Sequence, residues 1–141
     1  MKRIDAIDTL NSVVSEVSKV IIGRKDIIEM IIMALLADGH VLLEGVPGVA
    51  KTLLVSALCK TFGGHFVRIQ MVPDMLPSDI VGTEIIVGER LEIQPSPLIT
   101  ANFTLIDEIN RCPARTQAAL LQAMQERQIT ILGKKTFELQ L

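Results

Sequence analysis

Apolar positions in the first part of the chain recur with two different spacings. Residues 4–21 carry an apolar side chain at every third or fourth position, which predicts an amphipathic helix. Residues 24–37 are apolar on nearly all sides of a helical projection, which predicts a second helix buried by several neighbours. A short apolar run at 41–44 predicts a strand, and residues 51–62 return to the helical spacing. The expected order is therefore helix, helix, strand, helix.

The remainder of the chain combines strand-like runs with one more helical pattern. Strands are predicted at 66–70 and 103–107, and a helix is predicted at 113–127. Two pairs of short apolar runs, 84–87 with 91–93 and 129–132 with 136–141, are each interrupted by a glycine and predict two β-hairpins. Strands that alternate with helices in this way indicate an α/β fold with a mainly parallel sheet.

Composition and charge exclude several classes of protein. The chain has 141 residues, 49% hydrophobic and 21% charged, which fits one folded domain and excludes a disordered segment. Its net charge of −2 and its lack of a basic tract argue against a nucleic-acid partner. No signal peptide is recognisable, and the longest apolar tract, 27–37, is too short to span a bilayer. Cys59 and Cys112 show neither metal-ligand spacing nor a disulfide framework, so we expect packing thiols in a cytoplasmic protein.

A glycine-containing loop joins the strand predicted at 41–44 to the helix predicted at 51–62. It follows the phosphate-binding pattern G-x-x-x-x-G-K-[ST] except at one position. In that pattern the glycines turn backbone N–H groups toward phosphate oxygens, and the helix N-terminus adds free donors and a favourable dipole. Lys51 can then reach the β- and γ-phosphates, and the Thr52 hydroxyl can bind Mg²⁺. The candidate nucleotide-binding residues here are Gly45, Val46, Pro47, Gly48, Val49, Ala50, Lys51, Thr52 and Leu53.

Ala50 is the departure from this pattern, because it stands where the last glycine is expected. A methyl group fits that position without strain only if φ is negative, so we expect negative φ at Ala50, and the alanine slightly weakens the match to the pattern. The alternative interpretation is a Gly-Pro turn before an ordinary helix, with Lys51 on a solvated face. The strand and helix predicted on either side favour the phosphate loop.

A second candidate site follows the strand predicted at 103–107. The apolar run ends in two adjacent carboxylates, Asp107 and Glu108. In a parallel α/β sheet the carboxyl ends of the strands lie at the ligand edge, beside the phosphate loop. Asp107 would hold Mg²⁺, directly or through water, and Glu108 would orient and polarise the attacking water. Glu108 and Lys51 are therefore the catalytic candidates.

Three segments resemble the MoxR-type AAA+ ATPases: EGVPGVAKT, RIQMVPDMLPSDIVG and LIDEINRCPARTQAALLQAMQERQITI. The resemblance extends from about Val20 to about Leu132 and implies a P-loop NTPase core of the AAA+/ASCE type. That core is a three-layer αβα fold with sheet order 5-1-4-3-2, and such proteins tolerate alanine at the position of Ala50. Residues 1–40 would be N-terminal helices and 41–141 the P-loop core of a single partial domain. The resemblance implies that the first hairpin, about 83–95, is the insertion in helix 2 and that the second, about 128–140, is the hairpin before the first sensor.

The resemblance also implies a function and further site residues. It implies ATP and Mg²⁺ as ligands, a hexamer-like homo-oligomeric ring, and chaperone-like remodelling of a partner protein or insertion of its metal cofactor. Ile22 and Gly23 match the stretch that lines the adenine pocket in similar proteins. Gln70, at the end of a strand, would couple Glu108 to a bound partner. Arg111 would face a neighbouring subunit or remain a surface arginine.

One departure from the family concerns length. Similar proteins continue for about as many residues again, with a fourth strand that carries a sensor asparagine, an arginine finger and a helical lid. These parts are not among the 141 residues, so we expect a fragment or truncated product with an incomplete sheet. The alternative is a sheet that closes by a strand pairing the family does not use. An arginine finger contributes ~10³–10⁵ in rate, so efficient hydrolysis by this chain alone is not expected. The two functional hypotheses are an ATPase and a non-hydrolysing module that binds nucleotide or packs against other subunits.

Overall fold

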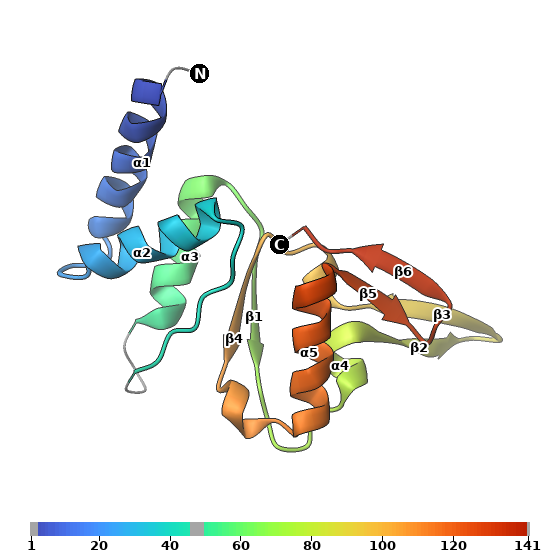
Figure 1. The fold of residues 1–141 in the computed structure, drawn as a ribbon. Helices are drawn as coiled ribbons and strands as arrows, with labels where there is room; N and C mark the ends of the chain where they lie inside the picture. The colour runs from blue at the N-terminus through green and yellow to red at the C-terminus, as the bar shows by residue number, and fades with distance from the viewer. Residues whose placement is uncertain (1–2, 46–49, 141) are drawn as a thin grey trace. The chain divides into compact units, whose positions relative to one another are not determined.

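A computed structural model of the chain describes residues 3–45 and 50–140 (Figure 1). The chain divides into two compact units, Met1–Gly64 and His65–Leu141, and each is described by itself. All of the described strands belong to the second unit. Within the described ranges, no helix is both long enough and apolar enough to cross a membrane.

Three helices form the first unit. α1 (Arg3–Ser18), α2 (Lys25–Leu36) and α3 (Lys51–Phe62) confirm the helices predicted in this part of the chain. α3 ends where Gly63 takes a φ of 72°, a left-handed conformation that glycine adopts readily. The helices share one apolar core, whose buried residues are Val13, Val14, Val17, Ile21, Ile28, Ile31, Ile32, Leu54 and Leu58.

The strand predicted at 41–44 is not formed, so that prediction is wrong. Residues 41–45 are in neither a helix nor a strand, and none of the described strands pairs with them. Leu43 packs partly against the helical core, whereas Leu42 is 74% exposed. A strand needs a neighbour whose N–H and C=O groups bond to its own. None of the described strands provides that neighbour, and an apolar pattern alone does not form a strand.

A pair of parallel strands lies at one side of the second unit, with α5 between it and the two hairpins (Figure 1). β1 (Phe66–Gln70) and β4 (Phe103–Asp107) confirm the two strands predicted there. They pair along their whole length, so that Gln70 lies opposite Asp107. This is the pairing expected for the second and third strands of the order 5-1-4-3-2. The described part of the chain adds no further strand to this sheet, so the α/β fold is present with an incomplete sheet.

Two antiparallel hairpins follow the predicted pattern. β2 (Gly82–Val87) pairs with β3 (Arg90–Pro95). β5 (Gln128–Ile131) pairs with β6 (Lys135–Glu138). The short helix α4 (Pro77–Val81) leads directly into β2. Both hairpins therefore lie at the positions that the glycine-interrupted apolar runs predict.

An ion pair links the two hairpins. Lys134, in the turn between β5 and β6, donates to both carboxylate oxygens of Glu84 on β2, at 2.8 Å and 3.1 Å. The Glu84 side chain is 16% exposed, so most of its surface is removed from water. The pair therefore fixes the turn of the second hairpin against the first.

Helix α5 (Ala114–Glu126) completes the second unit. Its Thr116 is fully buried, and the Thr116 hydroxyl donates to the carbonyl of Met75 at 2.7 Å. Two short 3₁₀ helices, η1 (Pro97–Ile99) and η2 (Ile109–Arg111), flank β4 along the chain. The buried core of this unit consists of Met71, Ile80, Leu98, Cys112, Leu120, Ala123, Ile129, Ile131 and Leu139.

Candidate functional site

The phosphate-loop candidates lie in the first unit, at the start of α3. Lys51 and Thr52 are the first two residues of this helix, and Leu53 follows them on an exposed position. The Lys51 amine donates to the carbonyl of Gly45 at 3.3 Å, so the side chain folds back over the beginning of the loop. The other predicted members, Val46, Pro47, Gly48 and Val49, lie outside the described residues.

Ala50 differs from its expected conformation. We expected negative φ, but Ala50 has φ 21° and ψ 22°. The chain turns sharply into α3 at this residue, since the Ala50 carbonyl already accepts the first helical hydrogen bond from Leu54 at 2.8 Å. Positive φ brings the methyl group close to the neighbouring carbonyl and is unfavourable for any residue with a Cβ. The alanine therefore stands where glycine would fit with less strain.

The carboxylate candidates lie in the second unit, at the end of β4. The Asp107 carboxylate accepts a hydrogen bond from Arg68 Nη2 at 2.6 Å. The same Nη2 donates to Gln70 Oε1 at 2.9 Å. The parallel register therefore brings together Arg68, Gln70 and Asp107 at the carboxyl edge of the β1–β4 pair.

Glu108 follows directly and has an unusual backbone. Its φ of 57° and ψ of 42° are left-handed, and it precedes the 3₁₀ helix η2. Arg111 Nε donates to Glu108 Oε2 at 3.1 Å. The chain therefore turns away from β4 at Glu108, and the Arg111 side chain forms an ion pair with the Glu108 carboxylate.

The Gln70 side chain bonds to a neighbour on its own strand. Gln70 Oε1 accepts a hydrogen bond from Arg68 Nη2, and the coupling role expected of Gln70 stays a prediction. Sequence reasoning missed Arg68, although its position two residues before Gln70 puts both side chains on the same face of a strand. The spacing of two residues between Arg68 and Gln70 was the signal by which the sequence could have identified Arg68.

The predicted adenine-pocket residues lie between α1 and α2. Ile22 is 87% exposed, and Gly23 has a φ of 75°. A substituted Cβ at Gly23 would meet no atom within 4 Å, so the glycine serves the turn and not a close packing contact. These two residues belong to the same unit as Lys51 and Thr52.

The side chains that could bind a divalent metal carry oxygen donors. They are the Thr52 hydroxyl in the first unit and the carboxylates of Asp107 and Glu108 in the second. The described ranges contain no group of three or more His, Cys, Asp or Glu side chains able to hold a metal by themselves. The two adjacent carboxylates of the second unit are donors of the kind that Mg²⁺ binds, with phosphate oxygens and water completing its shell. A structural zinc site uses cysteine and histidine ligands, which these side chains do not supply.

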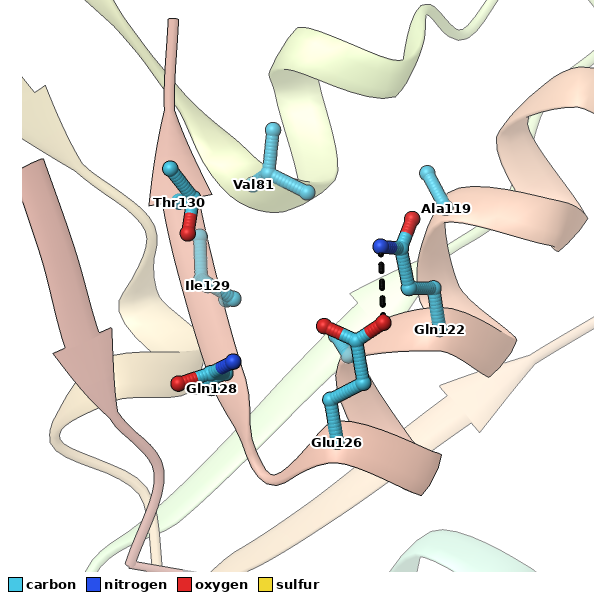
Figure 2. A pocket seen from close by; sticks show the side chains of 8 residues that line it. Val81, Ala119, Gln122, Glu126, Gln128, Ile129 and Thr130 are labelled. Carbon is cyan, nitrogen blue, oxygen red and sulfur yellow. Dashed lines mark hydrogen bonds between the residues drawn. The ribbon is translucent and has the colours of Figure 1, made fainter. Parts of the chain in front are cut away.

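A small hollow elsewhere in the second unit carries no predicted site residue. Figure 2 shows it between α5, β5 and the end of α4, with Val81 and Ile129 on its apolar side. Gln122 Nε2 donates to Glu126 Oε1 at 2.9 Å along one wall. The amide and carboxylate thus satisfy each other, and the Thr130 hydroxyl at the same hollow pairs with the Thr136 hydroxyl at 2.9 Å.

The chain is similar to proteins of known family. Residues 40–141 match the model of the ATPase family associated with various cellular activities (AAA). Chaperone MoxR1 of Mycobacterium tuberculosis is 48% identical over 133 residues, which cover 93% of this chain and 35% of the relative. Protein YeaC of Bacillus subtilis, named as uncharacterized, is 47% identical over 126 residues, covering 88% of this chain and 39% of the relative.

A solved structure shares the fold. The crystal structure of a protein named "putative ATPase" from Cytophaga hutchinsonii is 46% identical and superposes with a TM-score of 0.81, covering 94% of this chain and 40% of that one. The chain thus spans less than half the length of these relatives, a smaller share than the half expected from the sequence. The family match over most of the chain and the shared fold confirm the resemblance. The chain belongs to the ATPase family associated with various cellular activities (AAA), and its relatives in that family include MoxR proteins.

Proposed function

We propose that the chain is the nucleotide-binding part of a Mg²⁺-dependent, MoxR-like ATPase that remodels a partner protein or inserts its metal cofactor. The observation that carries the proposal is that both sets of phosphate-transfer side chains are intact. Lys51 and Thr52 begin α3 directly after the loop, and Asp107 and Glu108 end a parallel strand. The name of the Mycobacterium tuberculosis relative supports a chaperone-like role.

Each side chain has a proposed task at the phosphates. Lys51, whose amine lies 3.3 Å from the Gly45 carbonyl, would exchange that contact for β- and γ-phosphate oxygens. Thr52 and Asp107 would hold Mg²⁺, which neutralises phosphate charge when bound. Backbone N–H groups of the first turn of α3 would bind further phosphate oxygens. Ile22 and Gly23 would contact the adenine base.

Glu108 would orient the attacking water and accept its proton. Arg111 contacts Oε2 of this carboxylate at 3.1 Å, so the water would bind Oε1 or replace the arginine. Gln70 would transmit the state of a bound partner to this carboxylate. In a ring of like subunits, Arg111 would turn toward the neighbouring subunit.

The wider setting is also a proposal. We propose a homo-oligomeric ring for the full-length protein, ATP and ADP as its nucleotides, and a cytoplasmic location. The two cysteines support a reducing compartment, since Cys59 and Cys112 are both free and buried.

Calorimetry of Mg·ATP binding tests the nucleotide assignment. The chain, Lys51→Ala and the control Lys60→Ala are titrated, with circular dichroism recorded on the same samples. Lys60 is an exposed lysine of the same helix, so its replacement changes the net charge equally. We expect saturable binding by the chain and by the control, and loss of binding in Lys51→Ala. Equal binding by all three proteins, or no binding by a well-folded chain, would refute the nucleotide assignment.

Phosphate release then separates the two functional hypotheses. An ATPase predicts turnover that Glu108→Gln abolishes while nucleotide binding is retained. Saturable binding without turnover would favour the non-hydrolysing module for this chain. Turnover that survives Glu108→Gln would refute the role proposed for Glu108.

A further inference from the structure

One guanidinium bridges two of the candidate site residues at the carboxyl edge of the β1–β4 pair. Arg68 and Gln70 lie two residues apart on β1 and share a face, and Asp107 lies opposite Gln70 on β4. Arg68 Nη2 donates to Asp107 Oδ2 at 2.6 Å and to Gln70 Oε1 at 2.9 Å. All three residues belong to the second unit and lie within its regular strands.

We propose that Arg68 competes with a divalent cation for the carboxylate of Asp107, and so sets the metal affinity of the site. The inference rests on the proposed function, in which Asp107 is a ligand of Mg²⁺. An oxygen lone pair that accepts a guanidinium N–H at 2.6 Å is not available to a metal ion or its water. A guanidinium that stays nearby also repels the dication. Both effects lower metal affinity, so their sign does not depend on whether Arg68 moves away.

The competition also reaches Gln70. The same Nη2 atom serves both oxygens, so displacement of Arg68 from Asp107 changes the hydrogen bonding of the Gln70 amide. Metal binding at Asp107 is thereby linked to the side chain of Gln70. Sequence reasoning gives that position the coupling role, and the geometry supplies the residue through which the coupling passes.

The expected size of the effect follows from solvent exposure. The side chains of Arg68 and Asp107 are 46% and 26% exposed, so water and salt screen the pair. Partly exposed ion pairs of this kind correspond to about a two- to fivefold change in an equilibrium constant. Arg68→Met keeps the length of the side chain and removes its charge, so it should tighten metal binding by that factor. Arg68→Lys keeps the charge and should stay near the wild-type value.

Mn²⁺ alone is the probe, and line broadening of the backbone amide signals around Asp107 is the readout. The full chain, Arg68→Met, Arg68→Lys and Arg90→Met are titrated; the last removes an equal charge from β3. Tighter Mn²⁺ binding in Arg68→Met alone, absent when Asp107→Asn is combined with it, supports the competition. Equal or weaker binding in Arg68→Met, or broadening that does not centre on Asp107, overturns it.

A second measurement keeps the test decisive if Arg68→Met does not fold. In the wild-type chain, Mg²⁺ should shift the Arg68 Nε–H resonance, and the shift should disappear in Asp107→Asn. An Arg68 resonance that Mg²⁺ leaves in place overturns the proposal. Neither measurement contains nucleotide, so failure of Mg·ATP binding in the calorimetry refutes the proposed function separately. Intact, Lys51-dependent Mg·ATP binding together with an unchanged Arg68→Met refutes only the competition.

Discussion

Replacement of Gly82 by alanine tests the close packing at the start of the first hairpin. Gly82 begins β2 with φ 100° and ψ 170°, a region that only glycine adopts without strain. A Cβ there would lie 2.7 Å from the Gln94 carbonyl oxygen, 2.9 Å from the Ser96 nitrogen and 2.9 Å from Ile131 Cδ1. Two of these three atoms are backbone, so a change of side-chain rotamer cannot relieve the contact.

The magnitude combines two effects. Backbone strain contributes about 1–3 kcal/mol, and the forced separation of packed groups contributes about 1–3 kcal/mol more. We therefore expect Gly82→Ala to lower the free energy of unfolding by about 2–6 kcal/mol, a large part of the 5–15 kcal/mol typical of a domain. Gly88→Ala is the matched control, because Gly88 turns the same hairpin at φ 65° with no atom within 4 Å of the added Cβ.

Urea unfolding followed by circular dichroism measures this difference, since the chain contains no Trp or Tyr. Hydrogen exchange on the same variants assigns the loss to residues of the second unit. The reasoning predicts a loss for Gly82→Ala that exceeds the loss for Gly88→Ala by about 1–3 kcal/mol, which is the overpacking contribution. Equal losses would show that the hairpin moves freely to admit a methyl group, and would refute the close packing inferred at this glycine.

Three further predictions concern buried and half-buried groups. Thr116→Val should lower the free energy of unfolding by about 1–3 kcal/mol, because it leaves the Met75 carbonyl without the hydroxyl that donates to it at 2.7 Å. Thr116→Ser keeps the hydroxyl and should lower the free energy of unfolding less; equal losses in urea unfolding would contradict this. A double-mutant cycle of Lys134→Met with Glu84→Gln should give a coupling of about 0.2–1 kcal/mol that falls with added salt, and a coupling indifferent to salt would argue against an ion pair. Burial raises the pKa of the Cys59 thiol, and a backbone hydrogen bond from Gly64 offsets part of that rise. Because the thiolate is the reactive form, alkylation of Cys59 by iodoacetamide at pH 8 should be much slower in the folded chain than in urea. Because the folded state keeps this proton longer than the unfolded state, stability should fall as pH rises above the ordinary thiol pKa, and the fall should be smaller in Cys59→Ala.

Local patterns determined most of the secondary structure. The helical spacing at 51–62 and the alternation at 66–70 each depend on residues close together in sequence, and the structure confirms both elements. The motif ending in Asp107 and Glu108 was equally local, since it required only an apolar run followed by carboxylates. These features were predictable because each describes what a short segment needs in order to bury one face or to place a charge at a strand end.

The tertiary structure decided the features that depend on a distant partner. Residues 41–44 have the pattern predicted for a strand, but a strand exists only where another chain segment supplies hydrogen bonds, and none of the described strands does so. The ion pair of Arg68 with Asp107 joins residues on separate strands, and it follows from the parallel register and not from either motif. The positive φ of Ala50 likewise reflects how the chain enters α3. The sequence by itself therefore determined most of the elements and the type of chemistry. Contacts between distant segments decided that the strand predicted at 41–44 does not form and that Arg68 pairs with the Asp107 carboxylate.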